Sequence, residues 1–164
     1  GNFDIYLMDN EGGDIKQLTD IGGISWDPSW SPDGQNIVFA HLADGTLDWQ
    51  LYLVKPDTSE LKPLGEGVYG WKPEWSPVDD RIVFAAKKNG AWGLKMTNSE
   101  GSFEEDLFFD GYNSYEPVWS DDGKQIAFGN DRYGEKEIFI LDLETKELSA
   151  TRQVGLPTDW SEIS

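Results

Sequence analysis

The stretch SWDPSWSPDGQNIVFA, residues 25–40, is the part of the sequence that decides the fold. It returns as GWKPEWSPVDDRIVFA at residues 70–85 and as SYEPVWSDDGKQIAFG at residues 114–129. Three copies at a period of about 44 residues are typical of a repeat protein, in which each repeat forms one small structural unit. The fold can therefore be predicted from the secondary structure of one repeat, which should recur along the chain.

Each repeat contains four short apolar segments separated by turn residues. In the first complete copy, two of them lie within residues 25–40, and the others are DWQLYLVK at 48–55 and ELKPL at 60–64. The segments are too short for helices, are rich in β-branched and aromatic residues, and are bounded by Gly, Pro, Asp and Asn. Four strands at this period match one blade of a β-propeller. The predicted fold class is all-β, a propeller of four-stranded antiparallel blades.

The whole chain is expected to form one array of blades. Its 164 residues hold three full periods and a remainder of about 31 residues. We expect outer strands of a partial blade at 1–20, full blades at 24–64, 69–109 and 114–153, and the inner strand of another partial blade at 158–164. Because the closing blade lacks its second strand, four blades close only with strain. A fragment of a longer propeller is expected, or a homo-oligomer formed through edge strands.

Turn residues and prolines place the first strand of each repeat. Asp33-Gly34 and Asp122-Gly123 suit a hairpin turn that needs positive φ. A proline within the first strand removes a ladder N–H, which is tolerated only at a sheet edge; the prolines are Pro28, Pro73 and Pro117. The first strand is therefore predicted to border the central channel.

The second aromatic residue of each first strand is interpreted as a structural wedge between neighbouring blades. These residues are Trp30, Trp75 and Trp119, and a tryptophan in such a place buries on the order of 200 Å². Trp26 precedes Trp30 by an even number of positions. Alternation along a strand then predicts that both rings face the same neighbouring blade.

The first aromatic residue of each first strand is the candidate binding position. Trp26, Trp71, Tyr115 and Trp160 are spaced 45, 44 and 45 residues apart, and three of them are followed by Asp27, Lys72 and Glu116. Such a ring around one channel mouth would stack on sugars or grip a peptide, since aromatic side chains give contact area at low entropic cost. The alternative, which we favour, is that these rings pack between blades.

Composition and charge exclude several function classes. The formal charge is −18, with 31 acidic and 13 basic residues, so a nucleic-acid partner is not expected. Cysteine is absent, and no apolar run approaches the roughly 20 residues of a membrane helix. The single histidine, His41, follows a second strand and is expected at a surface or edge. Without a further base or a Gly-x-Ser-x-Gly motif, no catalytic residues are assigned.

Two short motifs suggest ligands that their context does not support. Residues 65–70, GEGVYG, match a dinucleotide pattern, but a proline-containing strand follows instead of a helix. Residues 9–14, DNEGGD, offer oxygen ligands at a turn, but their spacing misses that of a calcium loop. A plain hairpin turn is favoured over calcium there, and no metal or other cofactor is assigned.

The repeated motif resembles that of the TolB-type propeller family, a relative of the WD-repeat architecture. Residues 28–34 carry Pro-x-Trp-Ser-Pro-Asp-Gly in full, 73–77 carry its first half, and 117–123 carry a variant with aspartate for the second proline. Residues 3–19 also resemble the family's third and fourth strands. The resemblance implies a six- or seven-bladed propeller in the periplasm or outside the cell. Such propellers occur as protein-binding partners in the Tol system, in prolyl-oligopeptidase-like peptidases and in oligogalacturonate lyases.

Two functions from different classes follow. The first is a non-catalytic scaffold that binds a protein or peptide through its loops and channel mouth. The second is the gating or carbohydrate-binding portion of a larger enzyme. The first is the default, because the sequence offers no catalytic set.

Overall fold

Four antiparallel β-sheets follow one another along the chain in the computed structural model, which describes residues 2–160. The first sheet is a two-stranded pair, β1 (Tyr6–Leu7) and β2 (Lys16–Gln17). Blade 1 consists of β3 (Ile24–Trp30), β4 (Ile37–Leu42), β5 (Gln50–Val54) and β6 (Leu61–Pro63). Blade 2 consists of β7 (Trp71–Trp75), β8 (Arg81–Lys88), β9 (Ala91–Asn98) and β10 (Glu105–Phe108). Blade 3 consists of β11 (Ser114–Trp119), β12 (Gln125–Asn130), β13 (Glu137–Asp142) and β14 (Leu148–Val154).

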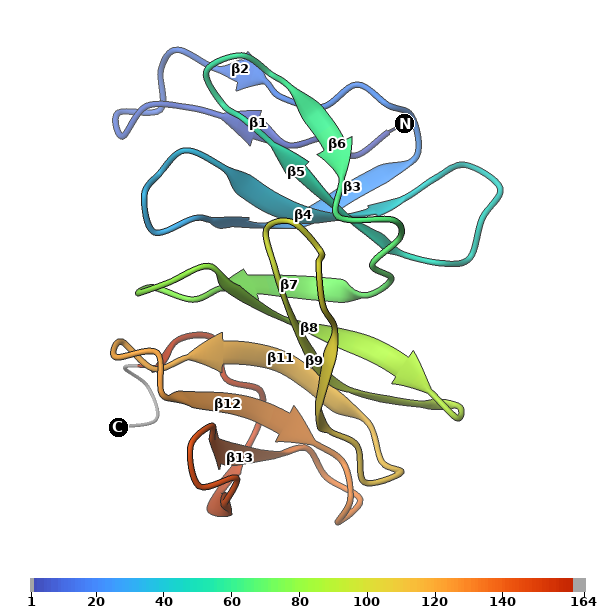
Figure 1. The fold of residues 1–164 in the computed structure, drawn as a ribbon, viewed down its shortest axis with the longest axis vertical. Helices are drawn as coiled ribbons and strands as arrows, with labels where there is room; N and C mark the ends of the chain where they lie inside the picture. The colour runs from blue at the N-terminus through green and yellow to red at the C-terminus, as the bar shows by residue number, and fades with distance from the viewer. Residues whose placement is uncertain (1, 161–164) are drawn as a thin grey trace.

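Each blade is a meander in which every strand pairs with the next one along the chain. The strands are joined by tight turns, with Gly34 and Gly123 at φ of 69° and 67° in the turns after β3 and β11. The sheets are stacked in chain order along the long axis of the molecule (Figure 1). The predicted all-β propeller fold with four-stranded antiparallel sheets is confirmed.

A β-bulge interrupts the first strand of every blade at the same position. In β7, Trp71 lies opposite Ala85 and Trp75 lies opposite Ile82, so four steps on β7 match three on β8. The register shifts in the same way in β3 and β11. The extra residue interrupts the regular alternation of side chains along the strand. In β7 both aromatic residues, Trp71 and Trp75, nevertheless pack on the same apolar cluster between blades 1 and 2, as expected.

The core consists of apolar clusters between successive sheets. Trp75 is 6% exposed and packs among side chains of blades 1 and 2, and Trp119 is 6% exposed and packs among those of blades 2 and 3. Trp30 has the equivalent position in blade 1 but is 47% exposed. On that side the preceding sheet contributes only β1 and β2 among the described residues. The role of Trp30 as a wedge between blades therefore stays a prediction.

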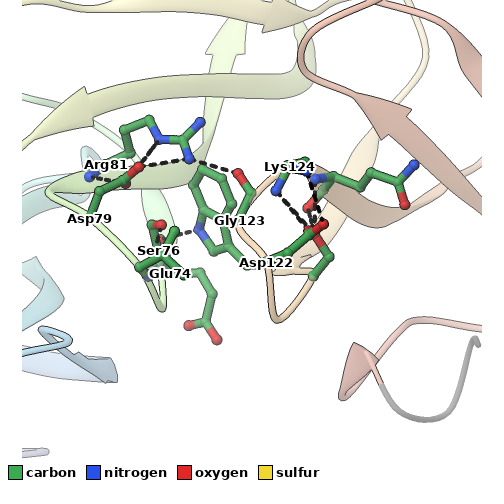
Figure 2. A network of polar contacts seen from close by, with 11 residues as sticks. Glu74, Ser76, Asp79, Arg81, Asp122, Gly123 and Lys124 are labelled. Atoms are coloured by element: carbon green, nitrogen blue, oxygen red, sulfur yellow. Dashed lines mark hydrogen bonds and ion pairs between the residues drawn. The ribbon is translucent and has the colours of Figure 1, made fainter.

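Polar contacts also join blades 2 and 3 beside Trp119. The indole N–H of Trp119 donates to the backbone carbonyl of Glu74 at 2.9 Å. Figure 2 shows Arg81 extending from blade 2 toward the β11–β12 turn, where its guanidinium donates to the carbonyl of Gly123 at 2.6 Å. The same guanidinium pairs with Asp79 at 2.8 Å and lies over the Trp119 ring, 4.9 Å from its centroid. This interface is therefore held by directed contacts as well as by apolar burial.

The end of the chain is described only in part. The expected inner strand at 158–164 falls largely on residues 161–164, which lie outside the described residues, and residues 158–160 form no strand. Within residues 2–160 there is no helix of the length and apolar character that would cross a bilayer.

Candidate binding site at the inner strands

The bulge residues of the three blades form a row of alternating charge. Asp27, Lys72 and Glu116 have φ of 53°, 52° and 50°, in the left-handed region that L-residues rarely adopt. The ammonium of Lys72 lies 2.8 Å from a carboxylate oxygen of Asp27 and 3.0 Å from one of Glu116. Burial alone would lower the pKa of Lys72, but its bonds to the two carboxylates outweigh burial and raise that pKa. Asp27, Lys72 and Glu116, which occupy equivalent positions in the three repeats, thus lie in contact with one another through Lys72.

A cavity of 480 Å³ adjoins this row. The three first-strand prolines, Pro28, Pro73 and Pro117, contribute to its wall. Each lies on the edge strand of its sheet, where its missing N–H costs no ladder hydrogen bond. The first strands of the three blades thus border one cavity, and that this cavity belongs to a central channel stays a prediction. Residues 156–158, which follow β14, line the same cavity.

Glu74 is the titratable residue of this cavity that departs furthest from its ordinary behaviour. Burial raises the pKa of Glu74 to about 7, and Asp27 and Asp159 add to the rise, while a hydrogen bond from Ser29 and the charge of Lys72 oppose it. The inner wall therefore holds a carboxyl group that changes charge near neutral pH. The sequence analysis did not identify Glu74, because it occupies a position that is Ser29 in blade 1 and Val118 in blade 3.

A second cavity, of 280 Å³, is lined by four tryptophans together with Asp27 and Lys72. We call it the tryptophan cleft; its aromatic residues are Trp26, Trp49, Trp71 and Trp92. Trp26 is 51% exposed and stacks on Phe3 with a centroid distance of 5.5 Å and an interplanar angle of 6°. The ring centroids of Trp71 and Trp92 are 5.8 Å apart. The expected aromatic position is therefore partly a cavity wall, and not only packing between blades.

Sequence reasoning missed Trp49 and Trp92, which stand at the entrance to the third strand of blades 1 and 2. The available signal was their shared phase, since Trp49, Trp92 and Lys136 are spaced 43 and 44 residues apart. The three positions lie just before or at the start of β5, β9 and β13. The pairing of consecutive strands does not reveal that these residues lie near the first strand, because the first and third strands of a blade are not neighbours in the sheet.

Tyr115 and Trp160 complete the predicted aromatic set but do not line the tryptophan cleft. The Tyr115 hydroxyl donates to Asp131 at 3.1 Å, and the Lys136 ammonium lies over its ring, 4.3 Å from the centroid. Burial and the neighbouring Asp131 carboxylate raise the pKa of Tyr115. Trp160 is half-buried and stands at the end of the described residues. The predicted set is thus divided between a cleft and a separate blade.

The expectation of a surface or edge histidine is corrected, because His41 is 3% exposed. Its Nδ1 lies 3.1 Å from the Ser25 hydroxyl, and its ring meets Tyr52 edge-on at 5.3 Å. Burial lowers the pKa of His41. In blade 3 the equivalent pair is Ser114 and Asn130, hydrogen-bonded at 3.2 Å. A buried cross-strand pair that recurs with asparagine is a structural contact, and both side chains are shielded from a substrate.

The turn at residues 9–14 is held by hydrogen bonds from backbone N–H groups to the side chain of Asp9. One carboxylate oxygen of Asp9 accepts the N–H groups of Glu11 at 2.9 Å and Gly13 at 2.6 Å. This is the local side-chain-to-backbone bonding that favours aspartate in turns. Across residues 2–160, no group of three or more acidic, histidine or cysteine side chains is arranged to hold a metal ion.

Relatives of known sequence share the repeats over most of this chain. A protein TolB homolog from Chlorobium luteolum is 30% identical over 150 residues, which cover 87% of this chain. The matched region is 32% of that relative, so the chain spans about a third of its length.

Solved structures show the same fold at lower identity. The putative TolB of Agrobacterium tumefaciens superposes with a TM-score of 0.79 at 21% identity, over 90% of this chain and 55% of that one. An oligogalacturonate lyase from Vibrio parahaemolyticus superposes with a TM-score of 0.66 at 16% identity, over 87% of this chain and 42% of that one. The family model described as the TolB beta propeller domain matches residues 1–113. This chain therefore belongs to the TolB β-propeller family.

Proposed function

We propose that this chain is part of a non-catalytic, TolB-like propeller of the periplasm that binds a protein partner at its channel mouth. The observation that carries the proposal is the row of bulge residues beside the 480 Å³ cavity. There, Asp27, Lys72 and Glu116 present alternating charge on rigid edge strands. Fixed, partly exposed charge of this kind gives a protein interface its orientation and its choice of partner.

The relatives support a protein partner rather than a small substrate. Several TolB sequences 31–32% identical to this chain are named Tol-Pal system proteins, which identifies Pal as the first partner to test. The periplasmic location is likewise proposed from these relatives.

The test measures binding of purified Pal, taken from the organism that encodes this chain, by calorimetry. The double variant Asp27→Lys, Glu116→Lys reverses both carboxylates beside Lys72, and we expect it to weaken binding at least tenfold. The matched control, Glu100→Lys with Asp121→Lys, makes the same charge change at exposed turn positions and should bind as wild type. Absence of wild-type binding, or equal affinity of the two double variants, would contradict the proposal.

A second candidate is the propeller portion of a larger enzyme. The similarity in fold to an oligogalacturonate lyase favours keeping it. The two candidates differ in what the parent gene encodes. A hydrolase domain downstream would support the enzyme, whereas a signal peptide ahead of a lone propeller would support the scaffold.

A further inference from the structure

We propose that the tryptophan cleft receives the arginine side chain of an extended basic peptide. The inference deepens the proposed function, on which it rests, by giving the chemistry of the partner segment. Four of the eight tryptophans in the chain line this one cavity, and the ion pair of Asp27 and Lys72 forms its polar side.

The rings of the cleft are held in place before any ligand arrives. Trp26 is stacked on Phe3, and Trp71 is packed against Trp92. Trp49 and Trp71 also pack on the apolar cluster between blades 1 and 2. A ligand that enters would therefore meet preorganised π-faces and would immobilise few further side chains.

Blade 3 shows which group this position accepts. At the place of Trp92, blade 3 has Lys136, and the Lys136 ammonium lies 4.3 Å from the ring centroid of Tyr115, which takes the place of Trp71. Blade 3 thus supplies its own cation to the aromatic ring. In the part of the chain that the structure describes, other cations lie over Phe108, Phe109, Trp119 and Phe139, and none lies over the four cleft rings. The cleft offers aromatic faces for a cation that the partner brings.

Charge favours a cationic ligand over an acidic glycan or peptide. The chain carries a formal charge of −18. Lys72 is the cation of the cleft, but it stands between Asp27 and Glu116, so the three groups together carry one negative charge. A guanidinium suits the site better than an ammonium, because it is planar, weakly hydrated and stacks on indole rings.

The neighbouring cavity indicates an extended ligand. It has a volume of 550 Å³ and shares Trp49 and Trp92 with the cleft, and Asp48, Tyr69 and Lys87 lie along it, one acid against one base. The two cavities therefore lie side by side, with these two rings as common walls. One arginine would enter the cleft while the flanking peptide lies in the larger cavity, where Asp48 and the Tyr69 hydroxyl are available to its backbone and side chains.

The test compares two capped pentapeptides, Gly-Ser-Arg-Ser-Gly and the same peptide with neutral citrulline for arginine. Binding to the full chain is followed by NMR through the indole N–H signals of ¹⁵N-labelled tryptophan. We expect the arginine peptide to shift the signals of the cleft tryptophans and to leave Trp30, Trp75 and Trp119 unchanged. The citrulline peptide should bind about tenfold more weakly, because it keeps the shape but loses the cation–π attraction.

Two variants on one strand provide a matched pair. Trp26→Leu removes a half-exposed cleft ring and should abolish the shifts, whereas Trp30→Leu removes a half-exposed ring outside the cleft and should leave them unchanged. Spectral dispersion shows whether each variant is folded. The wild-type comparison of arginine with citrulline stands even where a variant fails to fold.

Three results would overturn the inference: equal binding of the two peptides, shifts confined to tryptophans outside the cleft, or shifts produced by a neutral oligosaccharide but not by the arginine peptide. The last result would assign the cleft to a carbohydrate. Binding of Pal with a silent arginine peptide would reject this inference alone. Failure of Pal binding would instead reject the proposed function.

Discussion

The indole nitrogen of Trp119 lies 2.9 Å from the carbonyl oxygen of Glu74, the residue just before Trp75, which holds the place of Trp119 in the preceding blade. Blades 2 and 3 are therefore joined directly through their first strands. The same contact is not repeated one blade earlier, since the indole N–H of Trp75 is buried without a hydrogen-bond partner in the described structure. The position that Arg81 occupies in blade 2 is Asn36 in blade 1, and the asparagine side chain is shorter.

Replacing Arg81 should weaken the interface between blades 2 and 3. Arg81→Met removes the bond to the Gly123 carbonyl and the stacking on Trp119. We expect a loss of about 1–2 kcal/mol in the free energy of unfolding, measured in urea. Arg152→Met, at an exposed position of β14, is the control and should change the free energy little. Equal effects of the two substitutions would show that the Arg81 contacts contribute nothing specific.

Glu74 should make stability depend on pH near neutrality. Its pKa is about 7 in the folded state, against 4.5 as the ordinary value, so between these values the folded chain binds more protons than the unfolded chain. The contribution of Glu74 to stability therefore falls as the pH rises from about 4.5 to about 7.

Glu74→Gln should remove this dependence. At pH 8 the variant should be more stable than wild type, by an amount on the order of 2 kcal/mol, and the difference should shrink toward pH 5. Urea unfolding at several pH values measures it, with Glu135→Gln at an exposed position as the control. A constant difference between variant and wild type across this range would contradict the assignment.

The left-handed bulge should distinguish two substitutions at Glu116. Both Glu116→Gly and Glu116→Val remove the ion pair with Lys72, but only glycine adopts the observed φ of 50° without strain. The valine variant should be less stable than the glycine variant by about 1–2 kcal/mol. Thermal or urea unfolding measures the difference. Equal stabilities would mean that the bulge relaxes when its residue is changed.

Lys72 should contribute through the two carboxylates that it separates. Lys72→Gln leaves Asp27 and Glu116 without their cation, and we expect a loss of about 1 kcal/mol at low salt that diminishes in 1 M NaCl. Lys124→Gln is the control, because the Lys124–Asp122 pair is longer, 3.9 Å, and its side chains are 70% and 60% exposed. A loss that does not respond to salt would indicate that packing, and not charge, is responsible.

The repeats predicted the fold because each local signal agreed with the others. Strand length, turn glycines and edge prolines all indicated a four-stranded meander, and Pro28, Pro73 and Pro117 were assigned to a sheet edge by a missing hydrogen-bond donor alone. Such signals are local in the chain, and one sequence displays them three times.

The site was predicted less completely because its geometry depends on backbone detail. Nothing in the letters of WDPSW or WKPEW indicates that Asp27 and Lys72 adopt left-handed φ, so the bulge in the first strand was not predicted. Trp49 and Trp92 were missed for a related reason. They belong to third strands, which are separated from the first strand of the same blade by the second strand. Neither strand pairing nor sequence periodicity predicts that such residues line one cavity.

The repeated bulge separates two tasks that one strand would otherwise combine. In a regular strand, side chains that face the cavity would alternate strictly with side chains that hold the blades together. Here the inserted residue turns Asp27, Lys72 and Glu116 aside, and Trp75 and Trp119 keep their buried places between blades. The surface beside the 480 Å³ cavity can thus acquire a new pattern of charge while the scaffold that carries it keeps the same core.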